Sequence, residues 1–247
     1  MISLFQTRFS EDNPWFIRKH FDGVAIFEGC PLITVDKGSV LIAQGTPVSE
    51  VYYIEEGRAR FSVLSNDGDE KTICILDKGN VIGDMVAFNN KPSPINVIAN
   101  TNLSLRRLHI DKFLKAILSD INHAKLWITD LCFDIEYLIN HIKDISFRDS
   151  FNLVANYLYR LSENYGIDSL HGIKINMIFT HQEMADLIGC SRVTVSKIMT
   201  YLKDTNIIDR INGFIYIKDK AKLLELIQTG NSYSNIKGVT ISPKIKK

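Results

Sequence analysis

The sequence lacks any apolar run that approaches the roughly 20 residues a helix needs to cross a bilayer. Its opening stretch, MISLFQTRFSEDNPWF, also lacks the basic start and long apolar core of a signal peptide. Together these absences predict a cytoplasmic protein without a membrane partner. The content of apolar residues, 45%, and of charged residues, 23%, is typical of a soluble globular protein.

Cysteine is scarce, and its four copies form no CxxC pair and lie at no metal-ligand spacing from a histidine. The four are Cys30, Cys74, Cys132 and Cys190. We expect reduced thiols in the cytoplasm. We also expect Cys132 and Cys190 to be small core residues, because both lie near apolar positions.

Histidine is too sparse for a metal-dependent enzyme built on the first half of the chain. Such an enzyme needs clustered histidine and carboxylate ligands, and His109 is the one histidine between residues 24 and 110. We therefore predict that the protein is not an enzyme, with no catalytic residue, no metal site and no evident cofactor.

The net charge of +1 hides an uneven distribution. Residues 1–147 carry 15 basic and 19 acidic side chains, a net charge of −4. Residues 148–247 carry 14 basic and 9 acidic side chains, a net charge of +5. The modest basic excess of the second half favours an anionic partner there, such as the phosphates of a nucleic acid.

The most informative stretch is THQEMADLIGCSRVTVSKIMTYLK, residues 180–203, whose pattern predicts two short helices joined by a tight turn. Thr180 and Glu183 have the spacing of a capping box at the start of the first helix. Gly189 ends that helix, because only glycine adopts a left-handed backbone at little cost. Ser191 caps the second helix. These spacings are those of a helix-turn-helix.

Helical periodicity sorts the side chains of both helices into an inner and an outer face. The inner face is apolar and contains a small residue where the helices cross: Met184, Ala185, Ile188, Val195, Ile198 and Leu202. The outer face of the second helix is suited to a DNA groove, although solvent alone also favours a polar face. It carries Arg192, Val193, Ser196, Lys197 and Thr200.

A β-hairpin is predicted directly after the helix-turn-helix. Residues 206–211 and 214–218 are rich in β-branched and aromatic side chains, and Asn212-Gly213 between them is the strongest two-residue hairpin signal. A helix-turn-helix followed by a hairpin is a winged one. Two interpretations stay open for the basic residues near this wing, contact with phosphate or plain surface charge: Arg210, Lys218 and Lys220.

The middle of the chain carries an apolar heptad repeat without glycine or proline. Isoleucine at the a positions and mostly leucine at the d positions favour a parallel two-stranded coiled coil. We therefore predict a homodimer that pairs two recognition helices, and hence a two-fold operator. A helix packed on its own domain is the alternative. The predicted dimer seam consists of Ile121, Ala124, Ile128, Leu131, Ile135, Leu138, Ile142 and Ile145.

Residues 24–110 contain short strand-like runs separated by glycines, several at intervals of 11 or 12 residues. This even spacing predicts an antiparallel sandwich or roll. The runs are 51–54, 59–64, 72–76, 96–99 and 103–108, with a hairpin turn at 66–69. Asp111 is expected to cap a short helix over 112–118, and another helix is expected over 150–164.

The predicted fold class is α+β, with an N-terminal antiparallel β-roll, a long dimerisation helix and a C-terminal winged helix-turn-helix. The predicted parts are an N-terminal segment (1–23), an effector-sensing β-roll (24–118), a coiled-coil dimerisation helix (119–147), a DNA-binding domain (148–228) and a polar tail (229–247). A hinge is expected at residues 146–149.

With its parts in this order, the chain resembles the CRP/FNR family of bacterial transcription regulators over residues 24–228. The most specific match is residues 178–201, with IGCSRVTVSKI at its centre. The roll contributes KGSVLIAQGTPVSEVYYIEEGRARF and KGNVIGDMVAF. The resemblance implies a cyclic nucleotide-binding-like roll, binding of double-stranded promoter DNA as a homodimer, and control by a small effector. RNA polymerase is a further candidate partner.

The resemblance also implies which residues contact DNA. The base-reading positions of the family correspond here to Arg192, Val193, Ser196 and Lys197. Cyclic-AMP-type members have glutamate in place of Val193, so we expect a contact with a thymine methyl and an A·T-rich half-site. Positions that contact phosphate correspond to Thr180, His181 and Gln182. We add three hydroxyl side chains to the phosphate set: Ser191, Thr194 and Thr200.

The effector site departs from that of the cyclic-AMP-type members. Those members have Gly-Glu-Leu followed by Arg-Ser, whereas this chain has Gly83-Asp84-Met85 followed by Pro94-Ile95. Without the arginine no side chain pairs with the cyclic phosphate, and Leu138-Ile139 replaces the Thr-Ser that contacts adenine. We therefore expect an effector other than cyclic AMP.

The resemblance implies a pocket between the roll and the long helix. Its predicted lining is Gly83, Asp84, Met85, Val86, Asn89, Trp127, Leu131 and Leu138, with Asn90 as a further candidate. The pocket either binds an apolar or aromatic small molecule or is empty in a constitutively active protein. Asp84 either accepts a hydrogen bond from the ligand or forms a salt bridge. The cysteine cluster of the iron–sulfur members is missing, and only His20 and Cys30 are candidate haem ligands.

Overall fold

The computed structural model describes residues 24–68 and 70–229. They belong to two compact units, one within residues 15–138 and the other within 139–247. The predicted N-terminal segment with His20, the tail beyond residue 229 and Asp69 of the predicted turn lie outside the described residues. Among the described residues, no helix combines the length and apolarity that crossing a membrane requires.

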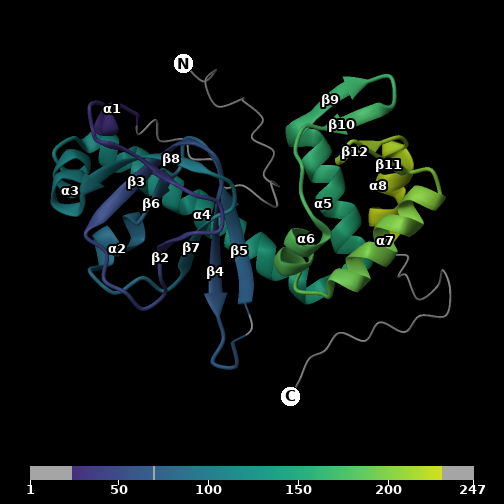
Figure 1. The fold of residues 1–247 in the computed structure, drawn as a ribbon, viewed down its shortest axis with the longest axis horizontal. Helices are drawn as coiled ribbons and strands as arrows, with labels where there is room; N and C mark the ends of the chain where they lie inside the picture. The colour runs from purple at the N-terminus through teal and green to yellow at the C-terminus, as the bar shows by residue number, and fades with distance from the viewer. Residues whose placement is uncertain (1–23, 69, 230–247) are drawn as a thin grey trace. The chain divides into compact units, whose positions relative to one another are not determined.

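The first unit is built on two four-stranded antiparallel sheets (Figure 1). One sheet has the order β1-β8-β3-β6, formed by Leu32–Val35, Leu103–His109, Glu50–Glu56 and Val81–Ile82. The other has the order β2-β7-β4-β5, formed by Val40–Ile42, Asn96–Ala99, Ala59–Leu64 and Glu70–Leu76. This arrangement confirms the predicted antiparallel roll.

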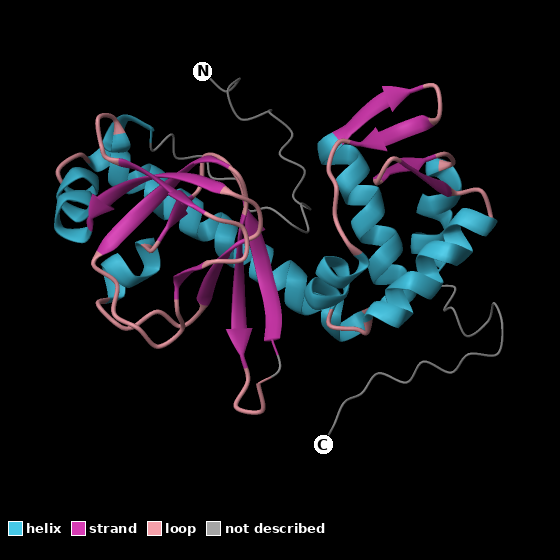
Figure 2. Ribbon diagram, in the orientation of Figure 1, coloured by secondary structure: helices cyan, strands magenta, loops and turns pink. Residues whose placement is uncertain are grey.

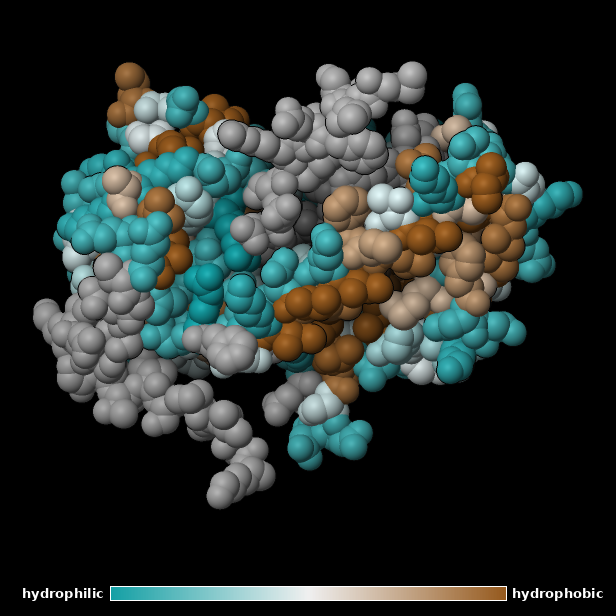
Figure 3. Space-filling model, turned by 180° about the vertical axis from the view of Figure 1, so that it is seen from behind, coloured by the Kyte–Doolittle hydropathy of each residue, from teal (hydrophilic) through white to brown (hydrophobic). Residues whose placement is uncertain are grey.

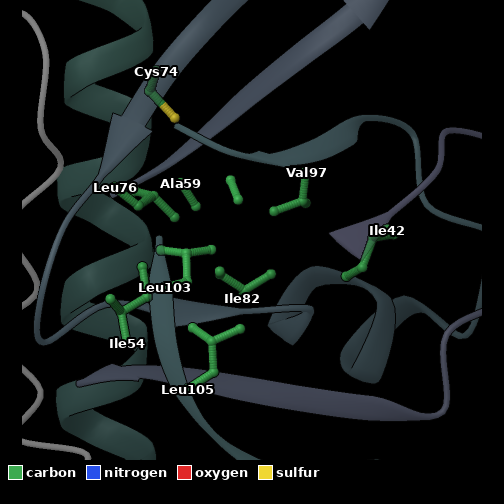
Figure 4. Packing of buried hydrophobic residues seen from close by; sticks show 10 residues of the cluster. Ile42, Ile54, Ala59, Cys74, Leu76, Ile82, Val97, Leu103 and Leu105 are labelled. Carbon is green, nitrogen blue, oxygen red and sulfur yellow. The ribbon is translucent and has the colours of Figure 1, made fainter. Parts of the chain in front are cut away.

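Side chains from both sheets fill one apolar core (Figure 4). Ile54 and Leu105 of the first sheet are fully buried, and Ala59 and Leu76 of the second belong to the same cluster. Cys74 is also part of it. Each large apolar side chain buried in this way stabilises the fold by about 1.5–3 kcal/mol, so the two sheets are held together by their inner faces.

All five predicted strand runs lie within observed strands, namely β3, β4, β5, β7 and β8. The strands β1, β2 and β6 were not predicted. They are two to four residues long, too short for an alternating pattern to stand out from the surrounding sequence.

A second core lies under three short helices, α1 (Val24–Phe27), α2 (Asp84–Asn89) and α3 (Ile110–Leu118). Trp127 of the following helix is 2% exposed in this core. Its ring meets that of Phe113 nearly edge-on, with 5.2 Å between the ring centroids. Aromatic packing of this kind joins the long helix to the roll.

The helix α3 begins differently from the prediction. Its N-cap is His109, whose Nδ1 accepts a hydrogen bond from the backbone N–H of Asp111 at 3.3 Å. The expectation that Asp111 caps this helix is therefore wrong. The strand β8 ends at His109 in an extended conformation, which places the cap there, and the Asp111 carboxylate lies in the first turn, where the helix dipole favours it.

The predicted long helix is α4, Ile121–Phe147 (Figures 1 and 2). One of its faces packs on the roll, where Trp127 is buried and the hydroxyl of Tyr137 donates to the backbone oxygen of Ile73 at 3.1 Å. Another face is apolar and exposed. We call it the α4 stripe, and its exposed members are Ile121, Ile128, Leu131, Ile135, Leu138 and Ile142. Figure 3 shows apolar side chains gathered on the molecular surface.

The expectation that Cys132 and Cys190 are core residues is wrong. Cys132 is exposed and Cys190 is half-buried. Cys132 follows Leu131 of the α4 stripe and lies away from the face that packs on the roll, and Cys190 lies in the turn between two helices. Nearness to apolar residues in the sequence therefore did not mean burial.

The second unit combines helices with a four-stranded sheet of order β11-β12-β10-β9. Its helices are α5 (Ser150–Tyr165), α6 (His181–Ile188), α7 (Arg192–Asp204) and α8 (Lys220–Thr229). Its strands are β9 (Gly166–Ser169), β10 (Gly172–Ile175), β11 (Ile208–Ile211) and β12 (Phe214–Ile217). Asn212 and Gly213 join β11 to β12 with φ of 50° and 84°, as a type I′ turn requires. The predicted wing is confirmed.

The hairpin β9–β10 and the helix α8 were not predicted. All four residues of β9 are exposed, so this edge strand has no buried face that an alternation of apolar and polar residues would mark. It pairs with β10 through the register Gly172 to Ser169 and onward to Ile175 opposite Gly166. Its place in the sheet depends on that partner and not on its own pattern.

Buried polar groups join the last turns of α4 to α5. Asp144, only 3% exposed, forms an ion pair with Arg148 at 2.9 Å and accepts a hydrogen bond from Arg160 at 3.1 Å. Nδ1 of His141 lies 3.4 Å from the Tyr157 hydroxyl. Burial, and next the negative charge of Asp144, raise the pKa of Tyr157. These contacts hold both sides of the expected hinge at 146–149, whose role stays a prediction.

We predict that Asp144→Asn lowers the free energy of unfolding by about 2–3 kcal/mol, because it leaves two guanidinium groups without their shared counter-charge. Denaturant titration followed by circular dichroism at neutral pH measures this loss. The control is Asp168→Asn, since Asp168 is exposed on β9. Equal unfolding free energies for the two variants would contradict the role given to Asp144.

Candidate nucleic-acid interface

The two helices α6 and α7 begin and end where their local sequence directs. The Thr180 hydroxyl accepts the backbone N–H of Glu183 at 3.1 Å, and the Glu183 carboxylate accepts the backbone N–H of Thr180 at 2.6 Å. Gly189 ends α6 in the left-handed conformation, with φ of 81°. Ser191 caps α7 by accepting the N–H of Thr194 at 3.0 Å. The predicted capping box, turn and second cap are confirmed.

The inner faces of both helices are buried as predicted. Each of the six predicted side chains is at most 4% exposed: Met184, Ala185, Ile188, Val195, Ile198 and Leu202. Phe151 of α5 packs its ring near that of Tyr201, with 5.7 Å between the centroids. Because one side of α7 is fixed in the core, its opposite side faces outward along the whole helix.

The outward side of α7 is a continuous surface. Arg192, Val193, Lys197 and Thr200 are exposed, and Ser196 between them is half-buried. A surface hollow is lined by these five residues together with Tyr201, Asp204 and Thr205. Val193 is 63% exposed. The surface thus offers basic, hydroxyl and apolar groups on a single helical face.

A hydrogen bond connects the start of α6 to this surface. Nδ1 of His181 lies 2.8 Å from the hydroxyl oxygen of Ser196. Burial lowers the pKa of His181, and the positive charges of Arg210 and Arg192 lower it further. The ring is therefore neutral at pH 7. Sequence reasoning missed this pair, because its members are 15 residues apart on two helices and no local pattern relates them.

The remaining side chains of the expected phosphate set are partly occupied by internal bonds. Gln182 donates to the carboxylate of Asp186 at 2.6 Å. The hydroxyls of Ser191 and Thr194 bond each other at 2.8 Å, which leaves one of their two hydrogens for another acceptor. Thr200 donates to the backbone oxygen of Ser196 at 2.9 Å, so its hydroxyl must rotate to reach a phosphate.

The three basic residues near the wing differ in their surroundings. Arg210 is exposed on β11. Lys218 donates to the side-chain oxygen of Asn206 at 2.6 Å. Lys220 lies at the start of α8 and pairs with Glu163 of α5, which favours a structural role for its charge. Of the three, Arg210 is the best placed for a phosphate contact.

The residues expected around an effector lie in different environments. Gly83 adopts φ of 90° before α2, and Val86 is buried there. Met85 and Asn89 are exposed. Trp127 is packed in the second core of the roll. The assignment of these residues to an effector, together with Asp84, stays a prediction.

Two members of the predicted pocket also belong to the α4 stripe. Leu131 and Leu138 are 39% and 41% exposed. Their exposure suits a partner helix at least as well as a small molecule. Among residues 24–68 and 70–229, no group of three or more His, Cys, Asp and Glu side chains is arranged to hold a metal ion.

Known proteins match this chain in both units. Residues 32–120 match the family described as cyclic nucleotide-binding domain, and residues 154–226 match the Crp-like helix-turn-helix domain. The chain is 26% identical over 175 residues to the global nitrogen regulator of Synechococcus elongatus, a match that covers 70% of this chain and 79% of that protein. It is 23% identical over 198 residues to the anaerobic regulatory protein of Bacillus subtilis, with 77% of each covered.

The fold also matches solved structures. A structure of a CooA mutant from Carboxydothermus hydrogenoformans superposes with a TM-score of 0.69 at 21% identity, over 85% of this chain and 92% of that chain. At this level of identity the match establishes the fold: an antiparallel roll, a long helix and a helix-turn-helix.

The lowered pKa of His181 predicts a loss of stability in mild acid. A histidine whose pKa is lower in the folded than in the unfolded chain does not change the stability above about pH 6.5, its unfolded pKa. As the pH falls below that value, the histidine destabilises the fold. We expect the free energy of unfolding to fall more steeply below about pH 6.5 in the natural chain than in His181→Gln, which does not titrate there. Denaturant titrations over this pH range test it, and equal slopes would contradict it.

Proposed function

Since this chain belongs to the CRP/FNR family of DNA-binding transcription regulators, we propose that it acts as a homodimer on a two-fold operator under the control of a small effector. The family consists of regulators and not of enzymes. A cytoplasmic location and contact with RNA polymerase are parts of this proposal, as both are typical of the family. The proposed division of labour is sensing by residues 24–118, pairing by 119–147 and DNA binding by 148–228.

The observation that carries the proposal is the outward surface of α7. A helix whose inner side is fixed in a core and whose outer side is exposed fits the major groove of B-DNA. We assign base contacts to Arg192, Val193, Ser196 and Lys197. Arg192 suits the two acceptors of guanine, and a thymine methyl would cover the exposed Val193. Lys197 suits guanine or a phosphate.

Phosphate contacts are assigned to the start of α6 and to hydroxyls of α7. The capping box uses the N–H of Glu183, which leaves the first N–H groups of α6 and the positive end of its dipole for an anion. Thr180, His181 and Gln182 lie at this end. Ser191, Thr194 and Thr200 complete the assigned set.

The exposed α4 stripe supports the proposed homodimer. Ile121, Ile128, Ile135 and Ile142 are 57% to 79% exposed, which is costly for isolated helices in water. Their spacing of seven residues suits pairing with an identical helix. Ala124 and Ile145 are assigned to the seam because the sequence places them at d positions of the same heptad repeat. A parallel pair would present two α7 helices to half-sites about one DNA turn, or roughly 34 Å, apart.

The proposed effector is a small molecule other than cyclic AMP. The matched family is one of cyclic nucleotide-binding domains, yet the loop before β7 carries Pro94 and Ile95 where an arginine is expected. Arginine is the side chain best suited to pair with a phosphate through two hydrogen bonds. The hydroxyl of the neighbouring Ser93 donates to the backbone oxygen of Ile95 at 2.7 Å and so serves the loop itself.

Selection of bound duplexes from a random pool, with and without a metabolite extract, tests the proposal. We expect a palindromic consensus in at least one condition. Enrichment that depends on the extract would support an effector, and enrichment without it would indicate constitutive binding. The absence of any enriched sequence at low salt in both conditions would overturn the proposal.

Lys197→Ala is expected to reduce the ratio of operator affinity to random-DNA affinity about tenfold, as the loss of one base contact does. The matched control is Lys203→Ala, since Lys203 lies in the last turn of α7 and is 3.5 Å from Asp209. Fluorescence anisotropy on both duplexes gives the ratio. An equal loss on operator and random DNA would assign Lys197 to phosphate.

Ile135→Asp is expected to produce monomers in sedimentation, because it places a carboxylate in the centre of the proposed seam. The control is Lys143→Asp, an exposed position of α4 outside the stripe, which should remain dimeric. A dimer that persists in Ile135→Asp at low micromolar concentration would refute the seam.

A further inference from the structure

We propose that His181 is a positioning residue that decides which hydrogen-bonding groups of a DNA base are recognised by Ser196. With the ring neutral and bound to phosphate, Ser196 would select bases that present an amine in the major groove, adenine or cytosine. The inference rests on the proposed function, because it places α7 in that groove.

The geometry that supports this role is the bond between the two side chains. Nδ1 of His181 and the hydroxyl oxygen of Ser196 are 2.8 Å apart, within the range of a good hydrogen bond. Ser196 lies between Val193 and Lys197 on the outward surface of α7. Its backbone oxygen accepts from Thr200 at 2.9 Å. Among the described residues, His181 is the partner that orients the Ser196 hydroxyl.

The direction of this bond follows from the chemistry of the phosphate contact. A DNA phosphodiester only accepts hydrogen bonds, so the ring nitrogen that faces it must carry a proton. A neutral imidazole has a single N–H. If Nε2 donates it to phosphate, Nδ1 must accept the hydrogen of the Ser196 hydroxyl.

A hydroxyl that has donated its hydrogen offers only lone pairs to other partners. In the major groove, the donors that match it are N6 of adenine and N4 of cytosine. Guanine and thymine present acceptors at the corresponding positions, and these would face the lone pairs of Ser196 without a hydrogen between them. The histidine therefore gives the serine a preference that a free hydroxyl lacks.

Protonation of the ring reverses this polarity. In the imidazolium both nitrogens donate, so Nδ1–H would donate to Ser196 and release its hydroxyl hydrogen toward an acceptor of guanine or thymine. In the protein without DNA, burial opposes protonation of the ring, and the charges of Arg210 of β11 and Arg192 of α7 oppose it further. The phosphate at Nε2 in the complex acts in the opposite direction and raises the pKa of the ring. The amine preference should thus hold above the pKa of His181 in the complex and weaken below it.

The first experiment measures base preference at each operator position by anisotropy, at about pH 8 and about pH 6, on either side of the unperturbed histidine value. We expect one position in each half-site to prefer adenine or cytosine about tenfold at the higher pH. That preference should shrink or reverse at the lower pH. Using ratios between duplexes removes the general effect of pH on affinity.

Two variants separate the polarity of the bond from the phosphate contact. His181→Arg still donates to phosphate but cannot accept from Ser196, so the same position should shift toward guanine or thymine while affinity is kept. His181→Gln has both a donor and an acceptor, so it should keep the amine preference and lose its pH dependence. Circular dichroism checks that both variants fold.

Two further variants are the controls. Ser196→Ala should abolish the preference and make it insensitive to the residue at position 181. Leu170→Arg adds the same charge at a fully exposed turn outside the assigned contacts, so it should leave the base preference unchanged.

The outcomes distinguish this inference from the proposed function. Operator binding with the same base preference in the natural chain and in His181→Arg, and at both pH values, would overturn the inference and leave the proposed function standing. The absence of any preferred operator would overturn the proposed function and this inference with it.

Discussion

The surface of the second unit depends on one constraint, which is that α6 and α7 bury their apolar faces in the same core across a turn of a few residues. Gly189 makes the turn possible because its φ of 81° is strained for other residues. Ala185, fully buried, leaves room for the helices to cross. Once these faces are fixed, helical periodicity decides which side chains of α7 point outward.

Two faces of the helix α4 have different surroundings, one packed on the roll and the other exposed. Trp127 and Tyr137 join it to the roll through an aromatic core and a hydrogen bond. Asp144 joins its last turns to α5 through Arg160, and it also pairs with Arg148 in the link between the two helices. The remaining apolar stripe is exposed. A face of this kind in a DNA-binding family is best explained by a second copy of the chain, as we propose.

Features that are encoded by neighbouring residues were predicted well. The capping box at Thr180, the turn at Gly189 and the hairpin at Asn212 each depend on a few adjacent positions with special backbone or side-chain chemistry. Errors arose where a neighbour in space decided the outcome. The cap of α3 is His109 because β8 ends there, and Cys132 is exposed because the roll contacts another face of α4.

The sequence by itself determined the order of the parts, the helix-turn-helix with its wing and the heptad rows of α4, because each follows from local propensity and periodicity. The tertiary structure alone decided the pairing of β10 with β12, the ion pair of Asp144 with Arg160 and the bond between His181 and Ser196. These depend on groups that are distant in the chain and that folding brings together. Hydrogen bonds act only over about 3 Å, so no pattern along the chain reports which distant groups will meet.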